Sequence, residues 1–195
     1  RKILVADDNE MNRLVAAAIL ENYGASVLES DNGRATVEAI NTHHPDLVLM
    51  DIQMPELNGY ETTRLLRQLG NPIPVIALTA NAIKGESEKC LAAGMNDYIS
   101  KPFKEDEFLK TIARWLNTEL TQDLKKGENK QPVYTLESLL DISRGNEAFV
   151  QKMIRIFCEQ TPPMVREMKA AWQEKNLSSM GAIAHKMKPS IDNLN

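Results

Sequence analysis

Five short apolar runs, separated by stretches of helical periodicity, constrain the fold more than any other feature of the sequence. They cover residues 3–6, 26–29, 47–50, 75–78 and 98–100. The third run has no polar alternation, which is typical of a strand buried on both faces of a parallel sheet. The repeated unit predicts an α/β fold over residues 1–118, a doubly wound (βα)5 parallel sheet with helices on both faces.

The stretches between the runs carry the apolar stripes of helices that cover a sheet. Asn9 is a candidate N-cap for the first helix, and Gly24 follows its end. His43 and His44 precede Pro45 at another helix end, so we interpret both as ordinary helix-end residues. The stripe residues are Met11, Leu14, Val15, Ala18 and Ile19 in the first helix and Leu109, Ile112, Ala113 and Leu116 in the last.

Composition and charge exclude several classes of function. Residues 1–118 carry 12 Lys and Arg against 17 Asp and Glu, and residues 119–195 carry 11 against 10, so direct nucleic-acid binding is not expected. No run is long enough for a membrane span, and the start does not resemble a signal peptide. Cys90 and Cys158 lie far apart, which predicts free thiols in a reducing compartment. The first residue is not Met, so we expect a fragment of a longer protein.

Polar residues with chemical potential follow the predicted strands at one end. Asp7 and Asp8 follow the first strand, Asp51 the third, Thr79 the fourth and Lys101 the fifth. If the strand order is 2-1-3-4-5, these side chains converge on one crevice at the carboxyl edge. Clustered carboxylates raise one another's pKa or hold a cation, and oxygen ligands favour Mg²⁺. The pattern predicts that Asp51 accepts a phosphoryl group beside this ion.

Residues 1–118 resemble response-regulator receiver domains. The matching segments are Asp7-Asp8, Asp51-Ile52-Gln53-Met54-Pro55, Thr79-Ala80 and Lys101-Pro102-Phe103. The resemblance implies that Asp51 is the nucleophile that becomes an aspartyl phosphate. It also implies that Asp8, Asp51 and the backbone carbonyl of Gln53 hold Mg²⁺, with Asp7 acting through water.

The resemblance gives Thr79 and Lys101 roles at the transferred group. Thr79 would hydrogen-bond the phosphoryl oxygens, Lys101 would pair with them, and the Lys101–Pro102 peptide bond would be cis. Positioning and counter-charge do most of the catalysis of phosphoryl transfer. Such a domain catalyses its own phosphorylation and dephosphorylation, and whether it should be called an enzyme is left open.

Other interpretations of these residues remain at this stage. Asp7, Asp8 and Asp51 are also common as loop and cap residues, and the domain could bind partners without phosphorylation. A hydrolase of the haloacid-dehalogenase type needs a second Asp at position 53, where Gln53 stands. Tyr98 is either the family's mobile aromatic or a half-buried strand residue. Gln53 and Asn81 occupy positions that tune phosphate lifetime in the family.

Beyond residue 118 the strand pattern ends. Residues 119–133 are charged and predict a flexible linker. Residues 134–195 predict an all-α partial helical bundle, with a short helix at Leu136 to Leu140 and a long helix capped by Asn146. Thr161-Pro162-Pro163 predicts a kink or a break in that helix.

The last helix carries a candidate second phosphoacceptor, His185. Around the helix it lies between Lys186 and Lys188, on a stripe that also contains Gly181. It is expected near the exposed face. The segment from Ala184 to Ser190 resembles the phosphoacceptor motif of histidine phosphotransfer (HPt) domains. Pro189 departs from the family's glycine and is expected to bend the helix. The chain stops inside this helix, so the resemblance is to a C-terminally truncated HPt domain.

An apolar seam accompanies this histidine helix. Its residues are Leu177, Met180, Ala184, Met187, Ile191 and Leu194, at steps of three and four. The seam predicts a homodimer through residues 146–195, with a frayed end as the alternative.

Taken together, the resemblances predict a phosphorelay component from a hybrid sensor histidine kinase. Phosphate would reach Asp51 from a kinase histidine and pass to His185 or another carrier, and transfer within one chain is left open. The expected partners are a histidine kinase domain and other receiver or phosphotransfer domains, without direct nucleic-acid contact. The expected location is the cytoplasm, including the cytoplasmic part of a membrane-bound kinase. The alternative is an interaction or dimerisation module that works without phosphorylation.

Overall fold

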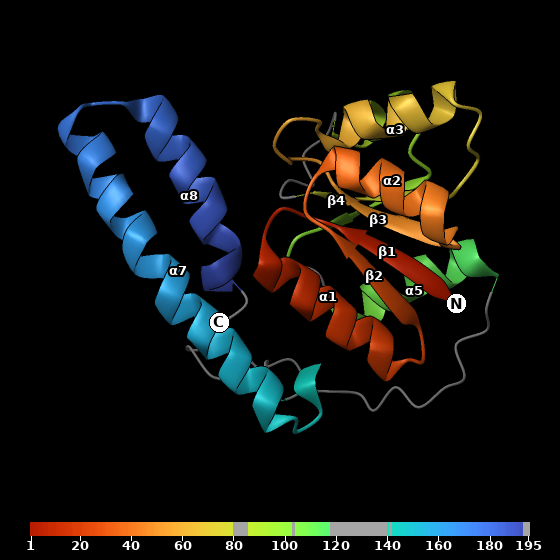
Figure 1. The fold of residues 1–195 in the computed structure, drawn as a ribbon, viewed down its shortest axis with the longest axis horizontal. Helices are drawn as coiled ribbons and strands as arrows, with labels where there is room; N and C mark the ends of the chain where they lie inside the picture. Colours follow the sequence, from red (N-terminus) through yellow and green to blue (C-terminus); the bar gives the residue numbers. More distant parts are fainter. Residues whose placement is uncertain (80–85, 103, 118–139, 141, 193–195) are drawn as a thin grey trace. The chain divides into compact units, whose positions relative to one another are not determined.

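All five predicted strands form and lie in one parallel sheet (Figure 1). The structure, a computed structural model, describes residues 1–79, 86–102, 104–117, 140 and 142–192. The strand order is β2-β1-β3-β4-β5, which confirms the predicted fold class. The strands are β1 (Lys2–Ala6), β2 (Ser26–Ser30), β3 (Leu47–Asp51), β4 (Val75–Thr79) and β5 (Asp97–Ser100).

Helices cover both faces of the sheet, with α2 and α3 on one side and α1 on the other (Figure 1). The helices of this unit are α1 (Glu10–Asn22), α2 (Gly33–His43), α3 (Gly59–Gln68), α4 (Glu86–Ala92) and α5 (Glu105–Leu116). The predicted stripes are largely buried: Met11, Val15 and Ile19 in α1, and Leu109 and Ile112 in α5. Leu14 and Ala18 are only partly buried.

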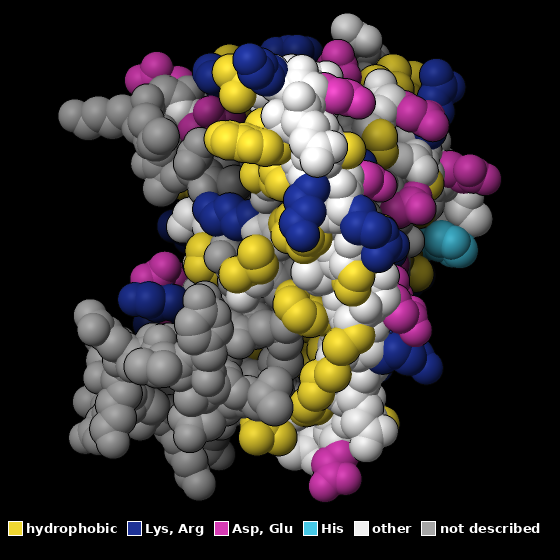
Figure 2. All heavy atoms as spheres, turned by 90° about the vertical axis from the view of Figure 1, so that its left-hand side faces the viewer, with side chains coloured by type: hydrophobic (Ala, Val, Ile, Leu, Met, Phe, Trp, Pro, Cys, Tyr) yellow, Lys and Arg dark blue, Asp and Glu magenta, His cyan; other side chains and the backbone are white. Residues whose placement is uncertain are grey.

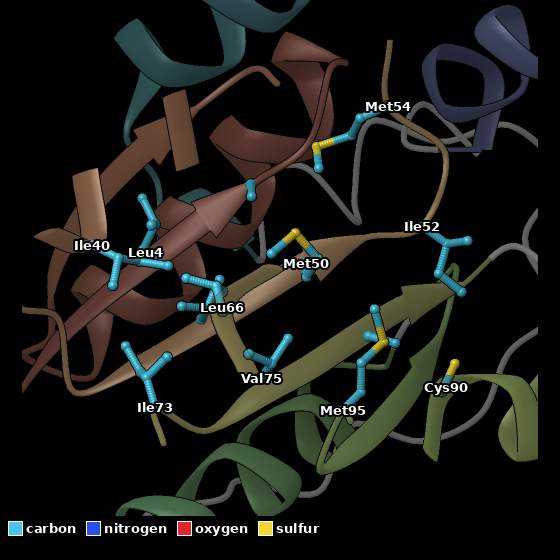
Figure 3. Packing of buried hydrophobic residues seen from close by; sticks show 13 residues of the cluster. Leu4, Ile40, Met50, Ile52, Met54, Leu66, Ile73, Val75, Cys90 and Met95 are labelled. Carbon is cyan, nitrogen blue, oxygen red and sulfur yellow. The ribbon is translucent and has the colours of Figure 1, made fainter. Parts of the chain in front are cut away.

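One hydrophobic core lies between the sheet and the helices α2, α3 and α4. Alternate residues of β1, β3 and β4 point to this side, as the period of two in a strand requires. Figure 3 shows Met50 of β3 and Val75 of β4 in this core together with Ile40, Leu66 and Cys90, one residue from each of the three helices. Because the central strands β1, β3 and β4 are buried on both sides, they are a rigid support for the residues at their carboxyl ends.

Local capping fixes where the site loops become helices. The Asn9 side chain accepts from the backbone N–H groups of Met11 and Asn12, which confirms the predicted N-cap of α1. Asn58 and Glu61 form a capping box at the start of α3. These caps end the loops after β1 and β3 at defined residues, so the segments that carry Asp7, Asp8 and Asp51 are short and anchored.

The helical unit contains α7 (Glu147–Gln173) and α8 (Leu177–Asp192), which pack against each other as a hairpin (Figure 1). The chain divides into two compact units, Arg1–Glu128 and Asn129–Asn195, with a boundary inside the predicted linker. Asn146 accepts from the backbone N–H of Phe149, so this predicted cap of α7 is confirmed. The whole predicted linker, residues 119–133, and residues 136–139 of the predicted short helix lie outside the described residues.

The sequence predicted a kink or a break in α7 at residues 161–163, and the prediction of a break is wrong. The helix runs through Pro162 and Pro163 as one element. Both prolines are exposed, as are Cys158 and Glu159, whose carbonyls lose their helical donors. Water can solvate those carbonyls, so the helix tolerates the prolines. The last helix likewise extends past Pro189 to Asp192.

Candidate functional site

The strand order places the predicted site residues at one edge of the sheet. β1 pairs with β3 with Ala6 opposite Met50, so Asp7 and Asp51, the next residues, lie side by side. On the other side of β3, β4 ends at Thr79, opposite Ser100 of β5. Open α/β sheets bind ligands outside the carboxyl ends of their strands, at the switch point in strand order. Here the switch point lies between β1 and β3.

Three carboxylates form the acidic part of the site. Ligand oxygens of Asp7, Asp8 and Asp51 lie within 4.8 Å of one another. Asp7 and Asp51 are buried, with Asp51 6% exposed, whereas Asp8 is more accessible. Three carboxylates this close repel strongly unless positive charge lies between them.

Lys101 supplies positive charge inside this cluster. Its Nζ lies 2.5 Å from Asp7 Oδ2 and 3.2 Å from Asp51 Oδ1. Burial alone would lower the pKa of Lys101, but the charges of Asp7 and Asp51 outweigh it and raise the pKa. Lys101 is therefore positively charged at neutral pH. The Lys101–Pro102 peptide bond on its carboxyl side is cis, as the resemblance implied.

The pKa of Asp51 is raised from 3.8 to about 7. Burial is the largest cause, followed by the negative charge of Asp7; Lys101 opposes both, and Asp8 adds to the rise. Near neutral pH the ionised and protonated forms of Asp51 are therefore close in free energy. A cation or anion that binds here changes this balance directly.

An Asp51→Asn variant is expected to be more stable than the parent chain at pH 8 in the presence of a chelator. The folded state binds the Asp51 proton between about pH 4 and pH 7, where the unfolded state has released it. The free energy of unfolding therefore falls as pH rises through this window, and asparagine removes that loss. The expected gain at pH 8 is on the order of 2 kcal/mol.

Urea unfolding at pH 5 and pH 8 measures this difference. It is best followed by Trp115 fluorescence in a Trp172→Phe background, because the chain has only these two tryptophans. The gain should be larger at pH 8 than at pH 5. A variant that is less stable than the parent chain at pH 8, or a gain independent of pH, would contradict the assigned burial of Asp51.

The remaining predicted residues of this unit are placed as follows. Thr79 is 4% exposed, and its carbonyl accepts from the Lys101 backbone N–H at 2.6 Å. The Gln53 backbone N–H donates to Asp51 Oδ1 at 3.4 Å. Tyr98 is 43% exposed, so its ring is not turned into the core in this structure. Asn81 lies outside the described residues.

Gly59 supports the Asp51 loop from behind and was not expected from the sequence. A Cβ at this position would lie 2.2 Å from the Asp51 backbone oxygen and 3.0 Å from Ile52 Cα. The Gly59 N–H also donates to the Ile52 carbonyl at 3.0 Å. The signal in the sequence was a glycine one residue after a capping Asn, but a close approach between two backbones depends on tertiary packing.

Two further contacts near the site were also missed. The Asn12 amide nitrogen lies 3.0 Å from both carboxylate oxygens of Asp7. The Tyr60 hydroxyl donates to the Glu86 carboxylate and links the starts of α3 and α4. Asn12 is buried, and the available signal in the sequence was a polar residue directly after Met11 of the apolar stripe. No pattern in the sequence pairs Tyr60 with Glu86, which are 26 residues apart.

The helical unit places His185 in the middle of α8. His185 has intermediate exposure. Lys186 and Lys188, which follow it in the helix, are exposed. No described atom lies within 4 Å of a Cβ built at Gly181, one turn before His185. The imidazole therefore has two cations and open space nearby.

The doubly wound sheet, with three carboxylates and a lysine at its switch point, places the chain among open α/β proteins whose ligand sites lie at the carboxyl ends of the strands. The model of the response regulator receiver domain family matches residues 3–113. The chain belongs to this family. The matched residues do not include α7 or α8.

Curated relatives include histidine kinases and a response regulator. The sensor histidine kinase GacS of Pseudomonas protegens is 37% identical over 150 residues, 74% of this chain and 16% of that protein. Histidine kinase 3 of Arabidopsis thaliana is 36% identical over 60% of this chain and 14% of that protein. The regulator DivK of Brucella ovis is 37% identical over 60% of this chain and 96% of that protein. The chain spans about a sixth of the length of GacS.

Solved structures of receiver domains are similar to residues of the first unit. The receiver domain of the sensor histidine kinase PA1611 from Pseudomonas aeruginosa, with a magnesium ion in its active site cleft, is 41% identical, with a TM-score of 0.56 over 60% of this chain and 98% of that chain. The Ssk1 receiver of Saccharomyces cerevisiae, in complex with the phosphotransfer protein Ypd1, is 27% identical, with a TM-score of 0.56 over 58% of this chain and 87% of that chain.

Among the described residues, no helix combines the length and the apolar character that a membrane span requires. The two cysteines are free: Cys90 is buried in the core and Cys158 is exposed on α7.

Proposed function

We propose that this chain is a phosphoacceptor of a two-component phosphorelay, in which Asp51 receives a phosphoryl group from a phosphohistidine of a kinase domain. The observation that carries this proposal is a buried carboxylate, Asp51, held 3.2 Å from Lys101 among three clustered carboxylates. Membership of the receiver family and the similarity to a sensor histidine kinase support it.

The residues of the site fit Mg²⁺. Three carboxylates face one ammonium group, so a divalent cation would neutralise the remaining charge. The carboxylate of Asp7 already accepts from Asn9, Asn12 and Lys101. Asp8, Asp51 and the backbone carbonyl of Gln53 would therefore hold the ion, with Asp7 acting through water. When bound, Mg²⁺ supplies positive charge to the phosphoryl oxygens.

The side chains of this chain then perform the transfer. An ionised Asp51 oxygen attacks the phosphorus, and the bond from phosphorus to the donor's imidazole nitrogen breaks. The electron pair stays on that nitrogen, which leaves as part of a neutral imidazole. Lys101 balances charge on the phosphoryl oxygens, and the Thr79 hydroxyl donates a hydrogen bond to one of them. Lys101 also favours the ionised form of Asp51, which is the nucleophilic form.

Incubation of the full chain with acetyl phosphate and Mg²⁺ tests this function. Intact mass should increase by one phosphoryl group, the label should be released by hydroxylamine, and peptide mapping should place it on Asp51. Repeated release of phosphate without a stable adduct would favour a hydrolase instead. No label under any condition would favour a scaffold that works without phosphorylation.

We also propose that the helical unit is phosphotransfer-like, with His185 as a second acceptor. Its support is the exposed pair Lys186 and Lys188 beside a partly exposed imidazole on a helical hairpin. The similarity to GacS covers 74% of the chain and so extends beyond residues 1–118. Phosphate would pass from Asp51 to His185 or to another carrier.

A His185→Gln variant is expected to lose alkali-stable, acid-labile label and to keep hydroxylamine-labile label on Asp51. Glutamine has no nucleophilic ring nitrogen, whereas the Asp51 site is unchanged. The measurement is the chemical stability of the label after two separate incubations, one with a phosphorylated receiver domain as donor for His185 and one with acetyl phosphate and Mg²⁺ as donor for Asp51. The matched control is His43→Gln, at the end of α2, which should label like the parent chain. Equal acid-labile label on the His185 variant would remove this residue from the relay.

The chain would act in the cytoplasm, as part of a hybrid sensor histidine kinase. ATP, the substrate of the kinase domain, is present there. Its partners would be a histidine kinase domain and other receiver or phosphotransfer domains. The complex of the Ssk1 receiver with Ypd1 shows that a similar receiver binds a phosphotransfer protein.

A second role, association of two copies through residues 146–195, is favoured by the apolar surface of the hairpin. Trp172 is 69% exposed and Leu177 77% exposed, and Ile154 and Ile191 are also exposed. Hydrophobic side chains form a band on this face (Figure 2). Exposed patches of this kind mark interaction sites. Light scattering should show a dimer at high concentration that a Trp172→Gln, Leu177→Gln variant loses; a strict monomer would contradict this role.

A further inference from the structure

We propose that Asn12 is a positioning residue for phosphoryl transfer, which holds the Asp7 carboxylate in the orientation that keeps Lys101 beside Asp51. The Asn12 Nδ2 lies 3.0 Å from Oδ1 and 3.0 Å from Oδ2 of Asp7. One donor at equal distances from both oxygens fixes the plane of the carboxylate as well as its place. This inference rests on the proposed phosphoacceptor role of Asp51.

The orientation of Asp7 matters because it is the nearer partner of Lys101. Lys101 Nζ lies 2.5 Å from Asp7 Oδ2 and 3.2 Å from Asp51 Oδ1. Asp7 is fully buried, so bulk solvent does not orient its carboxylate. The position of the ammonium group next to the nucleophile is therefore set by Asp7, and the position of Asp7 is set by its other donors.

Asn12 is itself held by the start of α1. The Asn9 side chain caps the helix by accepting from the backbone N–H of Asn12 at 3.2 Å, and the Asn9 N–H donates to Asp7 Oδ1 at 2.9 Å. Asn12 is 8% exposed in a helix, where a buried amide is costly unless it is hydrogen-bonded. The first turn of α1 is thus a rigid mount for one carboxylate of the site.

The first turn of α1 keeps the Asp7 carboxylate in place while Lys101 changes partners. When Lys101 pairs with phosphoryl oxygens on Asp51, the carboxylate of Asp7 retains Asn12 and the Asn9 N–H. Without Asn12 the carboxylate can rotate, and the ammonium group loses its fixed place. Residues that orient a catalytic group through another residue typically contribute about tenfold to a hundredfold to activity.

An Asn12→Ala variant of the full chain, with Asn22→Ala at the other end of α1 as matched control, tests the inference. The first readout is the rate of phosphorylation by acetyl phosphate at saturating Mg²⁺. The maximal rate of Asn12→Ala should fall about tenfold, with the half-saturating acetyl phosphate concentration little changed. The control should keep the rate of the parent chain.

The second readout is the ¹⁵N signal of the Lys101 ammonium group, assigned with Lys101→Arg and measured without any phosphodonor. It should shift or broaden in Asn12→Ala and stay unchanged in Asn22→Ala. A purely structural role of Asn12 would lower stability without moving this signal in the folded protein. If the alanine variant does not fold, Asn12→Ser serves, because its hydroxyl is too short to bridge both Asp7 oxygens.

The outcomes separate this inference from the function on which it rests. An unchanged Lys101 signal, or an unchanged maximal rate, overturns the positioning role of Asn12. A moved Lys101 signal in a chain that acetyl phosphate never labels supports the contact but overturns its role in phosphoryl transfer together with the proposed function. A slower maximal rate with a moved signal supports both.

Discussion

An Asp51→Asn variant is expected to lose hydroxylamine-labile phosphorylation by at least about a thousandfold, because an amide is not a nucleophile at neutral pH. Asparagine has nearly the same shape as aspartate, so β3 and its loop should keep their structure. Labelling by radioactive acetyl phosphate with Mg²⁺, quenched over time and expressed per folded molecule, measures the loss.

The matched control for this prediction is Asp31→Asn. Asp31 follows β2, also at the carboxyl edge of the sheet, but its exposed side chain contacts Asn32 and is not in the acidic cluster. This control should label at the rate of the parent chain. Labelling of Asp51→Asn at that same rate would show that another residue accepts the phosphoryl group.

A Gly59→Ala variant is expected to lose about 3 kcal/mol of the free energy of unfolding of the first unit. The new Cβ would lie 2.2 Å from the Asp51 backbone oxygen and 3.0 Å from Ile52 Cα. Both are backbone atoms, which cannot move aside as the end of a flexible side chain can. Urea unfolding followed by Trp115 fluorescence in a Trp172→Phe background measures the loss.

The loop must also shift away from the new methyl group, so the Asp51 nucleophile moves with it. We therefore expect slower labelling by acetyl phosphate per folded molecule. The control is Gly181→Ala in α8, where no described atom lies within 4 Å of the added Cβ. It should leave the Trp115 transition unchanged. A Gly59→Ala chain as stable as its parent would show that α3 does not pack closely on the Asp51 loop.

Expectations that depended on local pattern agree with the structure where it describes them. The parallel sheet follows from uninterrupted apolar runs such as residues 47–50, because such a strand must be covered on both faces. The caps at Asn9 and Asn146 form because an Asn side chain can satisfy the first free N–H groups of a helix over a few residues. The caps are short-range effects that depend on neighbouring residues alone.

Expectations that needed the third dimension were less complete. The prolines at 162 and 163 predicted a kink or a break, but a break depends on whether the freed carbonyls are buried, and here they belong to exposed residues. Tyr98 could have been half-buried or mobile, and only the surroundings of β5 determine that it is 43% exposed. Exposure is a property of the neighbours in space, which a residue's position in the chain does not state.

The same distinction applies to the site itself. The sequence by itself determined the types of side chain that meet at the carboxyl edge, because a (βα)5 sheet of order 2-1-3-4-5 brings the residues after β1, β3, β4 and β5 together. Only the tertiary structure decided that Lys101 lies nearer to Asp7 than to Asp51. It also revealed Asn12 on Asp7 and Gly59 against the Asp51 backbone. Differences of less than an ångström between such distances arise from the packing of many residues at once. The sequence pattern around a single residue does not state this packing.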